Sequence, residues 1–110
     1  MIVIVFRSRL RPGCDATRLG ALGERMYRLA ASMPGFISYK DFASEDGENV
    51  TLVEFESTET LADWRDHPEH QEAQRQGRAE FFSDYTIQVC QALRAYTFDT
   101  AAGRRELEVS

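Results

Sequence analysis

The sequence predicts one α+β domain with the element order βαββαβ and an antiparallel four-stranded sheet. Two observations carry this prediction. Runs of alternating or continuous apolar residues mark four strands, and apolar residues at helical spacing fill the longer intervals between them. Pro and Gly residues separate most of these segments. A chain of 110 residues is long enough for one such domain and too short for two. The predicted order is the split βαβ, or ferredoxin-like, arrangement.

The first half of the chain is expected to form a strand, a helix and a β-hairpin. Ile2–Leu10 is β-branched and apolar and then alternates, and a Pro-Gly pair shortly after it ends the strand. Asp15 is a suitable N-cap for a helix that extends to Ser32. Phe36–Ala43 and Asn49–Glu56 alternate as strands, and the Asp-Gly turn between them predicts a hairpin.

The second half is expected to contain two helices and the last strand. A short helix covers Thr58–Asp66, with Ser or Thr as its cap. The next helix covers about Pro68–Phe82, because Pro lacks an N–H group and suits the first helical position. Tyr85–Leu93 is the fourth strand. The domain then comprises residues 1–95, and residues 96–110 form a partly flexible C-terminal extension whose polar end is expected to fray.

Composition narrows the class of function. The formal net charge of -5 and the scattered basic residues disfavour binding to nucleic acid, which requires a basic face. The longest apolar run, Met1–Phe6, is too short to span a membrane, and arginines follow it instead of preceding it as in a signal peptide. Cys14 and Cys90 make no disulfide framework. We therefore expect a cytoplasmic protein without nucleic-acid or membrane partners.

Both faces of the predicted sheet are expected to be covered. A sheet with one solvated face alternates between apolar and polar residues, whereas Ile2–Phe6 and the Leu52-Val53 pair are apolar on both sides. The helices can cover only one face. A second copy packed sheet to sheet, giving a homodimer, would cover the other. The alternative is a two-sided apolar sheet left exposed, which would invite aggregation.

The segment from Leu61 to Gln74 contains the only Trp and both His residues of the chain. In the helix that begins at Pro68, one stripe of positions is small, apolar or histidine and is expected to face inward: His70, Ala73, Gly77 and Phe81. The opposite stripe faces water: Glu69, Glu72, Gln76 and Glu80. A titratable ring, an indole and small residues on one inward face predict a pocket.

The two histidines have different expected roles. His70 could transfer protons, or it could be a buried histidine bonded to the backbone or to Trp64. His67 precedes Pro68 and is expected to be a surface helix cap. A metal site at the two histidines is disfavoured, because the proline breaks the helical register and Glu69 falls on the water stripe. No metal is therefore expected.

Several motifs resemble the antibiotic biosynthesis monooxygenase (ABM) domain family of the dimeric α+β barrel group. The resemblance covers about residues 1–95. The motifs that carry it are Met-Pro-Gly-Phe at 33–36, Leu-Val-Glu-Phe at 52–55 with Ser57, the segment Trp64 to His70, and the aromatic residues Phe81, Phe82 and Tyr85. It implies the ferredoxin-like fold, the homodimer and a pocket between sheet and helices in each subunit.

The resemblance also implies a type of chemistry. Monooxygenases of this family oxidise electron-rich phenols, quinols or anthrones with O₂ and use no flavin, haem or metal, so no cofactor is expected. Such a reaction needs a base that withdraws a substrate proton, in apolar surroundings. His70 suits the base, and Trp64 suits an aromatic wall with an N–H donor. The candidate lining residues are Tyr39, Phe55, Phe81 and Tyr85.

The chain departs from the family's subgroups at several positions. Anthrone-oxidising members carry an Asn one turn before the Trp, where this sequence has Thr60. They carry a Tyr in place of His70 and an Arg that corresponds roughly to Asp84. Haem-degrading relatives carry an Asn in the first strand and a His near Gln74, so haem degradation is disfavoured. Two alternatives stay open: an isomerase or cyclase on the same scaffold, and a non-catalytic protein that binds and sequesters a reactive small molecule.

Overall fold

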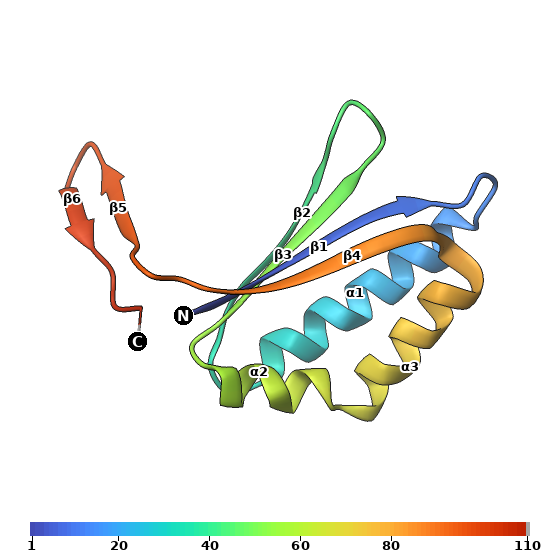
Figure 1. The fold of residues 1–110 in the computed structure, drawn as a ribbon, viewed down its shortest axis with the longest axis horizontal. Coiled ribbons are helices and arrows are strands. Elements are labelled where there is room, and N and C mark those ends of the chain that lie inside the picture. Colours follow the sequence, from blue (N-terminus) through green and yellow to red (C-terminus); the bar gives the residue numbers. More distant parts are fainter. Residues whose placement is uncertain (110) are drawn as a thin grey trace.

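The computed structural model describes residues 1–109 and has the predicted ferredoxin-like α+β fold (Figure 1). Four strands form an antiparallel sheet in the order β2-β3-β1-β4, and helices lie on one of its faces. The elements are β1 (Ile2–Leu10), α1 (Ala16–Ser32), β2 (Phe36–Ala43), β3 (Asn49–Phe55), α2 (Thr58–Arg65), α3 (Pro68–Gln76), the π-helix η1 (Gly77–Phe81) and β4 (Phe82–Gln91). In the part of the chain described, no helix is long and apolar enough to cross a membrane.

The predicted helix starts are confirmed by their caps. The Asp15 side chain accepts a hydrogen bond from the Arg18 N–H at 3.1 Å. Helix α2 begins with a capping box in which Ser57 and Thr60 exchange hydrogen bonds. Helix α3 begins at Pro68, and Nδ1 of His67 accepts from the backbone N–H of residue 69 at 3.1 Å. The cap role expected for His67 is therefore confirmed.

The helix expected over Pro68–Phe82 ends earlier and differently. Its regular α-helical part stops at Gln76, a π-turn follows, and β4 starts at Phe82 and ends at Gln91. Arg11 holds this turn, because its guanidinium donates to the carbonyl oxygens of residues 78, 79 and 82 at 2.5, 2.8 and 3.0 Å. A Cβ on Gly77 would lie within 2.6 Å of the Phe82 ring, so only glycine fits there without a shift.

The core lies between the sheet and the helices. Side chains from β1 and β3 pack beneath α1 and α2, and the buried members of this cluster are Ile2, Ile4, Ala30, Val53, Phe55, Leu61 and Trp64. A second buried cluster joins α1, α3 and η1 and comprises Leu22, Met26, Ala73 and Phe81. We call the helix-covered side of the sheet the inner face and the other side the outer face.

No helix lies over the outer face of the sheet (Figure 1), and apolar side chains of β1 and β3 point to it. Val5 lies directly opposite Leu52 in the ladder between β1 and β3, and Val3 lies opposite Glu54. Glu54 accepts a hydrogen bond from the Ser38 hydroxyl at 2.7 Å. Half-buried valine and leucine side chains at the centre of the sheet make this face suitable for a second protein surface.

The C-terminal arm, residues 95–109, forms a hairpin that the sequence analysis did not assign. Strands β5 (Tyr96–Asp99) and β6 (Gly103–Glu106) pair with each other and project from the body of the domain (Figure 1). The Asp99 carboxylate accepts from the N–H groups of residues 101 and 102, and Gly103 has a φ of 75°. This turn chemistry favours a hairpin where polar composition alone suggested a frayed end.

Candidate functional site

The rings of Trp64 and His70 are in tilted contact at the junction of α2 and α3. Their ring centroids are 4.2 Å apart, with an angle of 44° between the ring planes. Pro68 starts the second helix and turns the chain, so that the imidazole returns to the indole. On its other side, Trp64 contacts Phe55 at a centroid distance of 5.6 Å. Trp64 is 6% exposed and His70 is half-buried, so the pair is sheltered from water.

His70 is poised as a neutral imidazole. Its Nδ1 lies 3.2 Å from the carbonyl oxygen of Arg65, and a carbonyl can only accept, so Nδ1 carries the hydrogen in this bond. Burial lowers the pKa of His70 below its ordinary value, opposed in part by the Arg65 carbonyl. The lone pair then resides on Nε2. The arrangement therefore suits a proton acceptor at neutral pH.

The Trp64 indole has an unused hydrogen-bond donor. Nε1 is buried and has no acceptor among residues 1–109. A buried donor without a partner costs about 1–3 kcal/mol, so buried indole N–H groups usually find an acceptor. Because this nitrogen is buried, a ligand oxygen reaches it only when the side chains around the indole edge move. The pair thus combines a proton acceptor with a buried hydrogen-bond donor.

An uncovered apolar strip runs along β4 on the inner face. Val89 lies directly opposite Ile4, and Ile87 lies opposite Phe6, so these side chains share one face of the sheet. Ile4 is buried beneath the helices, yet Ile87 is 41% exposed and Val89 is 59% exposed. The helices therefore leave the β4 margin of the inner face open. We call Ile87 and Val89 the open strip.

Aromatic side chains close the other end of the open strip. Phe6 contacts Phe82 and Tyr85, each at a centroid distance of 5.3 Å, and Phe82 contacts Tyr85 at 5.9 Å. The Arg78 guanidinium, from η1, donates to the Tyr85 hydroxyl at 3.2 Å. This end of the strip therefore combines aromatic surface with a cation.

The structure distributes the predicted lining residues over three places. Phe55 is fully buried against Trp64, and Phe81 is 2% exposed in the second core cluster, so both are core residues and neither lines an open surface. Tyr39 lies on β2, and its ring centroid is 5.6 Å from that of Tyr27. Burial and the nearby Asp41 carboxylate raise the pKa of Tyr39 to about 12. Tyr85 alone of the four lies at the end of the open strip.

Sequence reasoning missed the open strip and Arg78. The alternation of Tyr85, Ile87 and Val89 had indicated a common side for them, but not that the helices stop short of it. Arg78 was assigned no role, because the π-turn that carries it has no signature in the apolar periodicity.

The side chain of Thr60, one turn before Trp64, is engaged within helix α2. The Thr60 hydroxyl donates to the Ser57 carbonyl at 3.0 Å and belongs to the capping box, so helix α2 already uses it. Within residues 1–109, no three His, Cys, Asp or Glu side chains are grouped as a metal ion would need.

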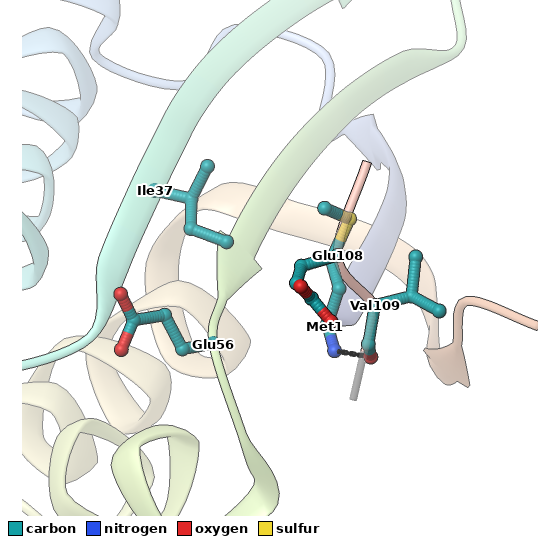
Figure 2. Close-up of a pocket in the computed structure, with 5 residues that line it drawn as sticks. All are labelled: Met1, Ile37, Glu56, Glu108 and Val109. Atoms are coloured by element: carbon teal, nitrogen blue, oxygen red, sulfur yellow. Dashed lines mark hydrogen bonds between the residues drawn. The ribbon is translucent and has the colours of Figure 1, made fainter. Parts of the chain in front are cut away.

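Two open hollows lie away from the Trp64–His70 pair. Each measures about 300 Å³, and they share Met1, Glu56 and Val109 as lining residues. Figure 2 shows Ile37 and Glu56 across from Met1, whose amino group donates to the Val109 carbonyl. These hollows separate the C-terminal tail from the edge of the sheet and contain neither the indole nor the imidazole.

Known proteins share this sequence pattern and fold. The family model for antibiotic biosynthesis monooxygenase matches residues 1–76. The chain belongs to the antibiotic biosynthesis monooxygenase family. It is 34% identical over 82 residues to the uncharacterized protein YqjZ of Bacillus subtilis, covering 74% of this chain and 72% of that protein.

Solved structures extend the ABM resemblance to nearly the whole fold. Rv0793 from Mycobacterium tuberculosis superposes with a TM-score of 0.73 at 24% identity, covering 92% of this chain and 98% of that one. SnoaB from Streptomyces nogalater, a cofactor-independent oxygenase, superposes with a TM-score of 0.72 at 14% identity, covering 86% and 94%. At these identities, the comparisons establish the ABM fold. The type of reaction has to be inferred from the residues of the site.

Proposed function

We propose that this ABM-family chain is a cofactor-independent monooxygenase that oxidises a small phenol, quinol or anthrone-like substrate with O₂. The observation that carries the proposal is the Trp64–His70 pair, which lies on the same face of the sheet as the open strip, because Trp64 belongs to the core cluster of Ile4 and Val89 lies opposite Ile4. Ile87 and Val89 offer an apolar surface for a flat ring, and the indole offers an unpartnered N–H. The description of SnoaB as a cofactor-independent oxygenase supports this choice of chemistry on the same fold.

In the proposed reaction, His70 starts the chemistry by removing a proton. Nε2 of the neutral imidazole accepts it from a substrate hydroxyl or from an activated CH₂ group, and the resulting anion is a stronger reductant. The Trp64 N–H stabilises the anionic oxygen. For an anthrone, the CH₂ group loses two hydrogens and gains one oxygen atom from O₂, and the second oxygen atom leaves as water. The substrate itself supplies the electrons.

We further propose that the protein acts as a homodimer through its outer sheet faces. Val3, Val5 and Leu52 are half-buried there without a helix over them. The C-terminal arm also exposes aromatic surface, because Tyr96 is 56% exposed and Phe98 is 67% exposed. In this proposal, residues 1–95 form the domain, and residues 96–110 form an extension that contributes to the dimer interface.

A cytoplasmic location is part of the same proposal. Cys14 is half-buried and Cys90 is exposed, and neither forms a disulfide. A reducing compartment keeps such thiols unpaired. We propose no nucleic-acid partner, because the net charge is -5 and no basic run is present.

The test is O₂ uptake by purified, chelator-treated protein with a panel of quinols, naphthols and anthrones. We expect uptake that persists with chelator and falls at least tenfold in His70→Ala, a typical loss for a proton-transfer residue. His67→Ala, which removes only a helix cap, is the matched control and should retain uptake.

Other outcomes select among the alternatives. Uptake unchanged in His70→Ala would remove the proposed base and keep the oxygenase. Substrate conversion without O₂ consumption would indicate an isomerase or cyclase. Binding without conversion of any compound in the panel would indicate a non-catalytic binding protein.

A further inference from the structure

We propose that Arg78 and Tyr85 form an anion-binding end of the substrate site, so that the preferred substrate is an electron-rich aromatic bearing a carboxylate. This inference rests on the proposed function for the location of the aromatic ring. It adds the position and the charge of a second recognition point, at the end of the open strip far from Trp64.

Arg78 on η1 and Tyr85 on β4 are joined by a hydrogen bond, and His70 lies about two turns before Arg78 along the same run of helix. His70, Gln74 and Arg78 follow one another at i, i+4 and i+8 and so share one stripe of α3 and η1. The bond from Arg78 to Tyr85 shows that this stripe reaches β4. The rise from residue 70 to 78 is about 12 Å for a helix, and four residues of β4 span about 13 Å. The helix stripe from His70 to Arg78 therefore matches in length the stretch of β4 from Tyr85 to Val89.

The charge of Arg78 is available to a ligand. Within residues 1–109, no carboxylate lies at ion-pair distance from its guanidinium, and its side chain bonds only the Tyr85 hydroxyl. The neighbouring acids are used elsewhere, because Glu72 pairs with Arg75 and Glu80 pairs with Arg18. A planar guanidinium with free N–H groups binds a carboxylate through two parallel hydrogen bonds.

The backbone that carries Arg78 is held in place. Arg11 donates to the carbonyl oxygens of Arg78 and Ala79, and its own N–H donates to the Phe81 carbonyl at 2.8 Å. A long side chain on a fixed backbone loses less freedom when it binds.

The experiment compares two probes that differ only in a carboxylate, 1,4-dihydroxynaphthalene and 1,4-dihydroxy-2-naphthoate. Binding is measured without oxygen through the fluorescence of Trp64, which is the only tryptophan. We expect wild type to bind the carboxylate probe about tenfold or more tighter, as a charge-assisted pair provides. Arg78→Gln should bind both probes equally, Arg78→Lys should keep part of the preference, and Arg105→Gln on the arm should keep all of it.

Each result separates this inference from the proposed function. A preference that survives in Arg78→Gln, or is absent in wild type, would overturn the anion site, whatever the O₂ uptake. An Arg78-dependent preference without O₂ uptake would support the anion site and overturn the oxygenase. Because Arg78 is exposed and circular dichroism reports folding, a general loss of structure in the variant is recognised separately.

Discussion

At Trp64 and His70, the neighbouring residues that the structure describes leave one hydrogen-bond donor and one acceptor unpaired, and the proposed function uses both. Nδ1 of His70 donates its hydrogen to the Arg65 carbonyl, so Nε2 is left as a hydrogen-bond acceptor. The described residues leave the indole N–H of Trp64 without an acceptor. In the adjacent capping box of α2, by contrast, the side chains of Ser57 and Thr60 each form a hydrogen bond with the other residue's backbone. The chemistry of the site thus depends on unpaired polar atoms among satisfied ones.

The first prediction concerns pH and His70. Burial lowers its pKa below the ordinary 6.5, so the unfolded chain binds this proton more readily than the folded one. The contribution of His70 to the free energy of unfolding should therefore be constant well above pH 6.5. It should decrease as the pH falls below 6.5, where the unfolded chain takes up the proton first. Urea unfolding on both sides of this pH should show a smaller decrease for His70→Gln than for wild type. An equal decrease in both would exclude His70 as the source.

The second prediction concerns two glycines with opposite surroundings. Gly35 has a φ of 79°, and a Cβ there would lie 2.5 Å from the Thr60 side chain, so Gly35→Ala should destabilise the fold by about 2–4 kcal/mol. Gly20 lies within α1 with nothing within 4 Å of an added Cβ. Gly20→Ala should therefore stabilise by about 0.5–1 kcal/mol. Thermal unfolding measures both, and equal shifts would contradict the geometric argument.

At the scale of elements, the sequence predicted the four strands of the main sheet and the helices, but neither the π-turn nor the hairpin of the C-terminal arm. The apolar pattern from His70 to Phe81 fits an α-helix, and nothing local shows that the helix widens after Gln76. The causes are distant in sequence, because Arg11 bonds the carbonyls and the Phe82 ring occupies the space beside Gly77. The hairpin turn of the arm does have a local sequence signature, because an Asp at position 99 and a Gly at position 103 are typical turn residues. Helix coverage of β4 depends on how α1 and α3 pack and so could not be predicted.

The third prediction tests the hold of Arg11 on η1. Arg11→Met keeps the apolar stem and removes three bonds to carbonyl groups, so we expect a loss of about 1–3 kcal/mol. Hydrogen exchange should accelerate in residues 77–82 more than in β1. The carboxylate preference of the probes should also weaken, since Arg78 is less fixed. Arg105→Met is the control, and an equal effect there would indicate a general loss of charge.

At the scale of the whole molecule, one chain leaves three apolar surfaces uncovered. They are the outer face around Val5 and Leu52, the aromatic side of the arm and the open strip. The sequence predicted the first, because strands that are apolar on both sides need two covers. The sequence did not predict the open strip, because its exposure depends on where the helices end. It did not predict the aromatic side of the arm, because that surface depends on the hairpin formed by β5 and β6. A second copy suits the first two surfaces, and a small aromatic molecule suits the third.

The fourth prediction follows from the outer face. Leu52→Asp places a charge opposite Val5 at the centre of the proposed interface, where burial without a partner is costly. Light scattering should show a dimer for wild type and a monomer for Leu52→Asp, with circular dichroism retained. Thr17→Asp adds the same charge at the exposed start of α1, on the inner side of the sheet, and should stay dimeric. A monomeric wild type would overturn the homodimer. A dimeric Leu52→Asp variant would move the interface to the arm, where removal of residues 95–110 should then dissociate it.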